Sequence, residues 1–81
     1  MMLYCVHIIM CEDGSYYTGY TKNLKSRIDL HINGKGAKYL NIHPPKKLVY
    51  VEKLESIVEA MRRERRIKKL THQQKHELIN S

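Results

Sequence analysis

Hydrophobic residues first mark two strands joined by a tight turn. The segment from Leu3 to Cys11 is dense in β-branched and aromatic residues and is apolar on both alternating faces. Such a pattern is typical of a central strand that is covered on both sides. The Asp13-Gly14 pair that follows favours the positive φ of a hairpin turn, so the segment from Tyr16 to Thr21 is predicted to be the returning strand.

A short helix and a loop are predicted next. Asn23 can cap a helix over residues 24–32, and Asn33-Gly34 ends it. Its apolar stripe is formed by Leu24, Ile28 and Ile32. Residues 34–39 carry two glycines, two lysines and a tyrosine, which indicates a loop.

The remainder of the chain predicts one strand and two helices. Residues 46–54 form the third strand. Ser56 and Glu59 make a capping box that opens a helix to about residue 70, and Thr71 and Gln74 make a second box for a final helix. The sequence therefore predicts one α/β (α+β) domain over residues 1–81, in the order β-β-α-β-α-α, with a three-stranded, mainly antiparallel sheet flanked by helices.

Charge narrows the choice of partners. The 81 residues carry a formal net charge of +7 and have a pI near 9.6, which favours a polyanionic partner, chiefly nucleic acid. No apolar run approaches the roughly 20 residues that span a bilayer, and the N-terminus does not resemble a signal peptide. On one strand Cys5 and Cys11 would lie roughly 20 Å apart, too far for a disulfide. We expect an intracellular protein with two free thiols and no membrane partner.

Glu64 is the most unusual residue of the second half. A helical wheel places it in the middle of the face that is otherwise formed by Ile57, Ala60, Met61 and Ile67. A carboxylate in an apolar stripe is costly unless it is paired or bound to a cation. A salt bridge to Arg27 or Lys68 and a metal-binding role both satisfy this requirement.

Two pairs of residues near the hairpin could carry chemistry. Arg27 and His31 lie four residues apart on one helix, where a guanidinium matches phosphate geometry and an imidazole can donate to phosphate or move a proton. His7 and Tyr17 lie on paired strands, and Gly19 leaves room beside Tyr17 for close approach. The structural alternative for each is ordinary: a solvated arginine, core histidines and a strand tyrosine.

Taken together, these features resemble the GIY-YIG nuclease domain over nearly the whole chain. The resemblance rests on Tyr17-Thr18-Gly19, on Arg27 and His31, on the loop from Asn33 to Tyr39, on Lys47-Leu48-Val49-Tyr50, and on Glu64 within the run from Arg62 to Leu70. The sequence departs from the pattern at Cys5-Val6-His7, where family members have Gly-Ile-Tyr or Tyr-Val-Tyr. His7 thus replaces a tyrosine that is the favoured general base of related enzymes.

The resemblance implies a metal-dependent endonuclease that hydrolyses phosphodiester bonds in duplex or branched DNA, in repair or recombination. Glu64 would hold Mg²⁺ or Mn²⁺, His7 or Tyr17 would help deprotonate water, Arg27 would stabilise the phosphorane-like charge, and His31 would bind phosphate or orient the base. Nucleic acid would be held by Lys35, Lys38, Arg62 and Arg65.

The sequence is compatible with two other functions. The chain could be a nucleic-acid-binding module that keeps the fold with weakened catalysis, which the His7 replacement favours. It could also be an interaction protein whose basic helix docks on an acidic partner. A protein partner that supplies specificity is compatible with the nuclease, and the sequence does not specify the oligomeric state.

Overall fold

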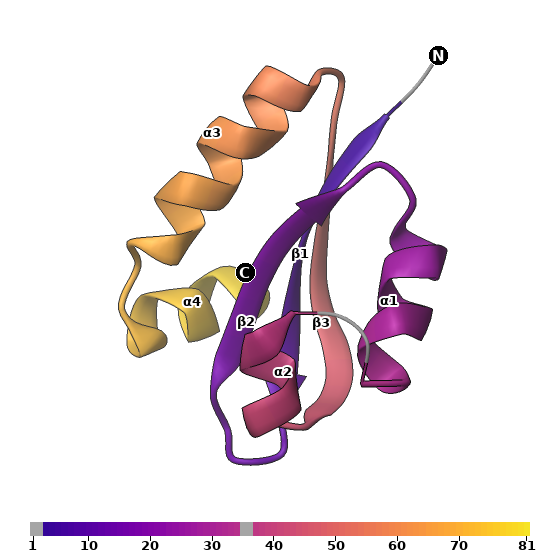
Figure 1. Cartoon of the computed structure of the whole chain (residues 1–81). Helices are drawn as coiled ribbons and strands as arrows, with labels where there is room; N and C mark the ends of the chain where they lie inside the picture. The colour runs from indigo at the N-terminus through magenta and orange to yellow at the C-terminus, as the bar shows by residue number, and fades with distance from the viewer. Residues whose placement is uncertain (1–2, 35–36) are drawn as a thin grey trace.

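A computed structural model describes residues 3–34 and 37–81. Within those residues the elements follow in chain order (Figure 1). They are β1 (Tyr4–Cys11), β2 (Tyr16–Thr21), α1 (Leu24–Ile32), α2 (Lys38–Ile42), β3 (Pro45–Leu54), α3 (Ile57–Lys68) and α4 (His72–Ile79). The α+β class is confirmed, with one short helix, α2, added to the expected order.

The sheet is antiparallel throughout and has the strand order β2-β1-β3. His7 in β1 is opposite Gly19 in β2 and Val51 in β3. The expectation that the first strand is central is therefore confirmed. Its position leaves β2 and β3 as the two edges of the sheet.

Each face of β1 supports its own small core. Val6 and Ile8 pack with Ala60 and Ile67 of α3 on one face. Ile9 and Cys11 pack with Leu40 of α2 and with the half-buried Ile28 of α1 on the other. Figure 1 shows α3 and α4 on one side of the sheet and α1 on the opposite side. The alternation of side chains along one strand thus organises both layers.

The predicted turn and helix caps are present, but in the described structure the box predicted at Ser56 has only the hydrogen bond from the Glu59 N–H to the Ser56 hydroxyl. Gly14 adopts a φ of +86° in the β1–β2 turn, and Gly34 a φ of +73° after α1, a region that suits glycine. The side chains of Asn23 and Ser56 accept hydrogen bonds from backbone N–H groups in the first turns of α1 and α3. Thr71 forms a complete capping box with Gln74. Local side-chain chemistry therefore defines where these helices begin.

The segment 34–39 is not wholly a loop, because Lys38 begins helix α2. This helix has five residues, and no side chain caps its N-terminus at Ala37. Leu40 is its one buried residue in the described structure. Helices this short are unstable in isolation, so α2 depends on tertiary contacts that cannot be predicted from the local sequence.

Two helices are rotated relative to the expected apolar stripes. In α1 the inward residue is His31, whose side chain is 2% exposed, whereas Ile32 is 68% exposed. In α3 the buried residues are Ala60 and Ile67, and the expected inward residues Ile57 and Met61 are 45% and 41% exposed. Glu64 therefore lies at the edge of the buried face rather than in its middle.

Neither cysteine forms a disulfide: Cys5 and Cys11 are both free thiols, as expected from their spacing on β1. Across the described parts of the chain, no helix has the length and apolar character needed to cross a membrane.

Truncating Ile67 tests the α3 core. Ile67→Ala removes a side chain that is fully buried beside Val6 and Ile8, so we expect the free energy of unfolding to fall by about 3 kcal/mol. Ile57→Ala, on the same helix but 45% exposed, should cost less than about 1 kcal/mol. Urea unfolding measures both, and equal losses would contradict the assignment of the buried face.

Candidate active site

A groove of about 470 Å³ runs around the edge strand β2 and lies between α1 and α3. We call it the β2–α3 groove. Its walls include Tyr17 and Gly19 of β2, Arg27 of α1 and Glu64 of α3. Four residues that the sequence singled out therefore converge from three elements. The remaining lining residues are Tyr4, Tyr20, Thr21, Lys22 and Ile57.

Glu64 presents a half-buried carboxylate to this groove, with 18% of its side chain exposed. Its Oε1 lies 3.5 Å from Nζ of Lys68, one helical turn later. Of the two salt-bridge partners that the sequence allowed, the structure shows Lys68. The Lys68 side chain is 53% exposed, so solvent weakens its attraction for the carboxylate.

Arg27 and His31 point to different environments although they share a helix. Arg27 is exposed and lines the β2–α3 groove. His31 is buried, and its Nδ1 accepts a hydrogen bond from the backbone N–H of Ala37 at 3.4 Å. The neutral ring therefore carries its proton on Nε2, which has no hydrogen-bond partner in the described structure. Arg27 is accessible to a ligand in the groove, whereas His31 is buried and contacts Tyr17.

His7 lies directly beneath Gly19. A Cβ atom at position 19 would meet Cε1 and Nε2 of the His7 ring at 3.2 Å, and Cε2 of Tyr17 at the same distance. The space that glycine provides is thus filled by the protein's own rings. His7 is 1% exposed, and neither of its ring nitrogens has a partner among residues 3–34 and 37–81.

His7, Tyr17 and His31 form one aromatic cluster. The ring centroid of Tyr17 is 6.4 Å from that of His7 and 5.5 Å from that of His31, which it meets edge-on. The two imidazole centroids are 6.2 Å apart. Tyr39 of α2 stacks on Tyr17 with centroids 5.9 Å apart. Of these rings, Tyr17 lines the β2–α3 groove, whereas His7 and His31 do not.

Burial keeps both histidines neutral. It lowers the pKa of His7 from 6.5 to about 4, and the nearby His31 and Arg27 add to this shift. Burial, followed by the positive charge of Arg27, also lowers the pKa of His31. Removing a cationic imidazole from water is unfavourable, so the neutral form dominates at physiological pH.

The expected nucleic-acid contacts are more scattered. Arg62 and Arg65 are exposed on α3 but do not line the groove, and Lys38 is exposed at the start of α2. Lys35 lies outside the described residues. Lys22 and Tyr39 were not predicted as site residues. Lys22 directly follows β2, and Tyr39 lies within residues 34–39, which the sequence marked as a basic loop. Their closeness in sequence to predicted site residues could have indicated them.

Stability should depend on pH through His7. Between its folded pKa of about 4 and its unfolded value near 6.5, the unfolded chain binds the proton and the folded chain does not. The contribution of His7 to the free energy of unfolding is therefore nearly complete above pH 6.5 and falls as the pH is lowered toward 4, by about 1.6 kcal/mol between pH 6.5 and 5. Urea unfolding of the wild type and His7→Phe at both pH values measures this contribution.

The His7→Phe variant should show the shallower pH dependence. An NMR titration of the His7 ring provides an independent measurement if that variant does not fold. A titration midpoint at or above 6.5 would contradict the burial argument.

Comparison with known proteins agrees with this geometry. The family profile described as the GIY-YIG catalytic domain matches residues 3–77. A UPF0213 protein of Staphylococcus epidermidis is 50% identical over 74 residues, which cover 91% of this chain and 90% of the relative. A UPF0213 protein of Clostridium perfringens is 54% identical over 76 residues, covering 94% and 82%.

Two solution NMR structures are similar in fold. The UPF0213 protein BH0048 of Bacillus halodurans has a TM-score of 0.63 and 43% identity, covering 98% of this chain and 84% of that one. A protein of E. faecalis has a TM-score of 0.68 and 33% identity, covering 99% and 85%. The profile match spans almost all of the sequence and includes every residue of the β2–α3 groove, so the chain belongs to the GIY-YIG catalytic-domain family.

Proposed function

We propose that this chain is a single-domain, metal-dependent endonuclease that hydrolyses phosphodiester bonds in DNA. The observation that carries the proposal is the convergence of Tyr17, Arg27 and Glu64 on one groove. A phenol, a guanidinium and a carboxylate can respectively handle a proton, a phosphate and a cation. The family match supports the reaction class.

Glu64 is the residue that would hold Mg²⁺ or Mn²⁺. No cluster of three or more metal-ligating side chains occurs in residues 3–34 and 37–81. A Mg²⁺ ion is commonly held by one or two carboxylates together with waters and substrate phosphates, and a half-buried carboxylate on a groove wall fits that pattern. A divalent cation bound there would supply positive charge for the phosphate and the leaving oxygen.

Tyr17 is the better placed of the two groups proposed to activate water. It lines the groove, whereas His7 is 1% exposed and is separated from the groove by Gly19. A general base must come within hydrogen-bond reach of the proton it takes, directly or through one water. We therefore assign proton transfer to Tyr17, and to His7 the support of the Tyr17 ring from below.

Arg27 and His31 would divide the remaining tasks. The exposed Arg27 guanidinium can donate to the phosphate oxygens and stabilise the negative charge that develops on them. His31 packs edge-on against Tyr17 and would orient it. Each role follows from exposure, because Arg27 is accessible to a ligand and His31 is not.

Basic residues around the groove would hold the DNA backbone. The net charge of +7 favours a polyanion, and we assign phosphate contacts to Lys35, Lys38, Arg62 and Arg65. We further propose that the protein acts inside the cell in repair or recombination, on duplex or branched DNA, and that a protein partner can add specificity.

A nucleic-acid-binding module with weakened catalysis is the second candidate. The buried position of His7, at the place where the GIY-YIG pattern has a tyrosine, favours it. An interaction protein that docks on an acidic partner would instead bind DNA no better than other polyanions. Cleavage assays separate the nuclease from the other two, and a comparison of binding to DNA and to another polyanion separates those two.

Removing the Glu64 carboxylate should abolish metal-dependent cleavage while DNA binding persists. We expect Glu64→Gln and Glu64→Ala to lower the cleavage rate at least about 100-fold, because the charge that holds the cation is lost. Labelled duplex, single-stranded and branched DNA are incubated with Mg²⁺, Mn²⁺ or EDTA. Glu59→Gln, an exposed carboxylate on the same helix, is the matched control and should retain activity. Binding without cleavage by the wild type on every substrate would favour the binding module.

Tyr17→Phe tests the assignment of the proton-transfer group. The variant keeps the ring that packs on His31 and Tyr39 but loses the phenolic oxygen, so the cleavage rate should fall about 100-fold or more. Tyr16→Phe removes the neighbouring phenol from the opposite face of β2 and should remain within about twofold of wild type. Full activity of Tyr17→Phe would reject Tyr17 as the base.

A further inference from the structure

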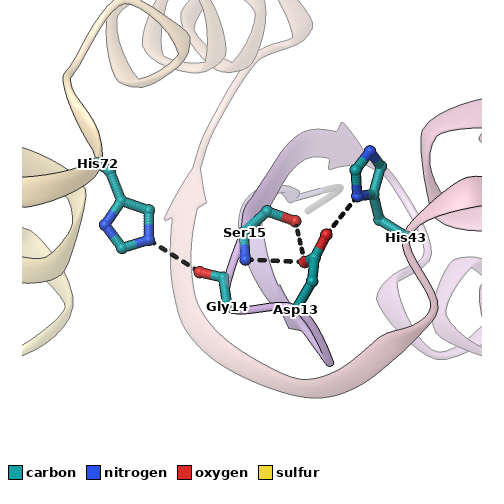
Figure 2. A network of polar contacts seen from close by, with 5 residues as sticks. All are labelled: Asp13, Gly14, Ser15, His43 and His72. Carbon is teal, nitrogen blue, oxygen red and sulfur yellow. Dashed lines mark hydrogen bonds and ion pairs between the residues drawn. The ribbon is translucent and has the colours of Figure 1, made fainter.

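The tip of the β1–β2 hairpin is held from both sides by histidines that lie far away in the sequence (Figure 2). On one side His43, which follows α2, donates from Nδ1 to Oδ2 of Asp13 at 2.5 Å. On the other side His72, in α4, donates from Nε2 to the carbonyl oxygen of Gly14 at 2.8 Å. The two contacts attach different helices to one turn.

Asp13 is held in a single orientation. Its Oδ1 accepts from the backbone N–H of Ser15 at 3.0 Å and from the Ser15 hydroxyl at 2.6 Å, while Oδ2 accepts from His43. The hydrogen bonds from Ser15 and His43 keep the pKa of Asp13 well below its usual value. Asp13 is thus an ionised and oriented acceptor, although it is exposed.

His43 terminates a helix that has few attachments of its own. Helix α2 has five residues, lacks a side-chain cap at Ala37 and buries Leu40. Its N-terminal end is attached by the hydrogen bond from Ala37 to His31. Its C-terminal end is attached by His43 to Asp13, and by the hydrogen bond from the Glu12 N–H to the Pro44 carbonyl. Helix α2 therefore adopts the orientation that these contacts set.

A ladder of rings connects this attachment to the groove. The His43 ring stacks on Tyr39 with centroids 4.2 Å apart and planes 22° apart. Tyr39 in turn stacks on Tyr17, with centroids 5.9 Å apart and planes 29° apart. Tyr17 lines the β2–α3 groove. The Asp13 carboxylate is linked to the proposed proton-transfer group through two ring stacks and one hydrogen bond.

We propose that Asp13 and His43 are positioning residues for the β2–α3 groove: they orient α2 so that Tyr39 holds the Tyr17 ring in place. This inference rests on the proposed function in assigning catalysis to Tyr17. Neither residue lines the groove, so their effect passes through Tyr39. A ring that meets His31 edge-on and stacks on Tyr39 has little freedom to tilt, and displacements of about 1 Å can cost up to about 100-fold in rate.

The test compares His43→Phe with His72→Phe. His43→Phe keeps an aromatic ring to stack on Tyr39 and removes the hydrogen bond to Asp13. His72→Phe does the same on the other face of the sheet, because His72 stacks on Tyr16 with centroids 4.6 Å apart and bonds to the same turn. The pair separates loss of the Tyr17 ladder from a general loosening of the hairpin tip. Asp13→Asn removes the negative charge of the group that accepts the hydrogen bond from His43. It replaces His43→Phe in the test if that variant does not fold.

Two readouts are measured on the full chain. NMR of ¹³C-labelled tyrosine rings reports the surroundings of Tyr17 and Tyr39. Single-turnover cleavage of labelled DNA gives the rate at saturating protein and the concentration for half-maximal rate. We expect His43→Phe and Asp13→Asn each to shift the Tyr17 ring resonances and to lower the saturating rate about tenfold, with the half-maximal concentration unchanged. The double variant should be no slower than either single one, because both remove the same contact.

Three outcomes would overturn the inference. They are unchanged Tyr17 resonances in both His43→Phe and Asp13→Asn, an equal effect of His72→Phe, and a lower rate explained entirely by weaker DNA binding. If the wild type cleaves no substrate with either metal, the proposed function fails, and the NMR comparison alone still decides whether Asp13 and His43 position Tyr17.

Discussion

The burial of strand β1 on both faces is the constraint from which the rest of the structure follows. Val6 and Ile8 face α3, while His7 and Ile9 face α1 and α2. Because both faces need cover, a short chain builds two thin layers rather than one thick core. Arg27 belongs to one layer and Glu64 to the other, and they face a common groove around the edge strand β2. The candidate site is therefore a consequence of the sheet order.

The burial of His7 has a structural cost. Two unpartnered ring nitrogens in a buried site are unfavourable, and burial keeps the ring neutral. In return the ring fills the space beneath Gly19 and supports Tyr17. The groove is accordingly lined by Tyr17, Arg27 and Glu64, whereas the imidazoles of His7 and His31 are buried and contact the Tyr17 ring.

Local signals predicted most of the fold but little of the packing within the site. The Asp13-Gly14 turn and the caps at Asn23, Ser56 and Thr71 act over a few residues, so the sequence contains all of the required information. Helix α2 could not be predicted in this way, since a five-residue helix without a cap is stabilised by Leu40 and by contacts to other elements.

The orientation of side chains was harder to predict for the same reason. Apolarity alone turns Ile32 inward, whereas the structure buries His31 and exposes Ile32, because the partners of His31 come from β1, β2 and the start of α2. The availability of the cationic side chains of α3 was equally hard to predict from the sequence. Arg63 bonds to Glu52 at 3.0 Å and Lys68 lies beside Glu64, so a charge count overstates what the helix offers to phosphate. The distinction is physical: the carboxylate that holds Arg63 also accepts a hydrogen bond from Tyr50, whereas Lys68 is 53% exposed, and an ion pair with so exposed a partner contributes about 0–1 kcal/mol.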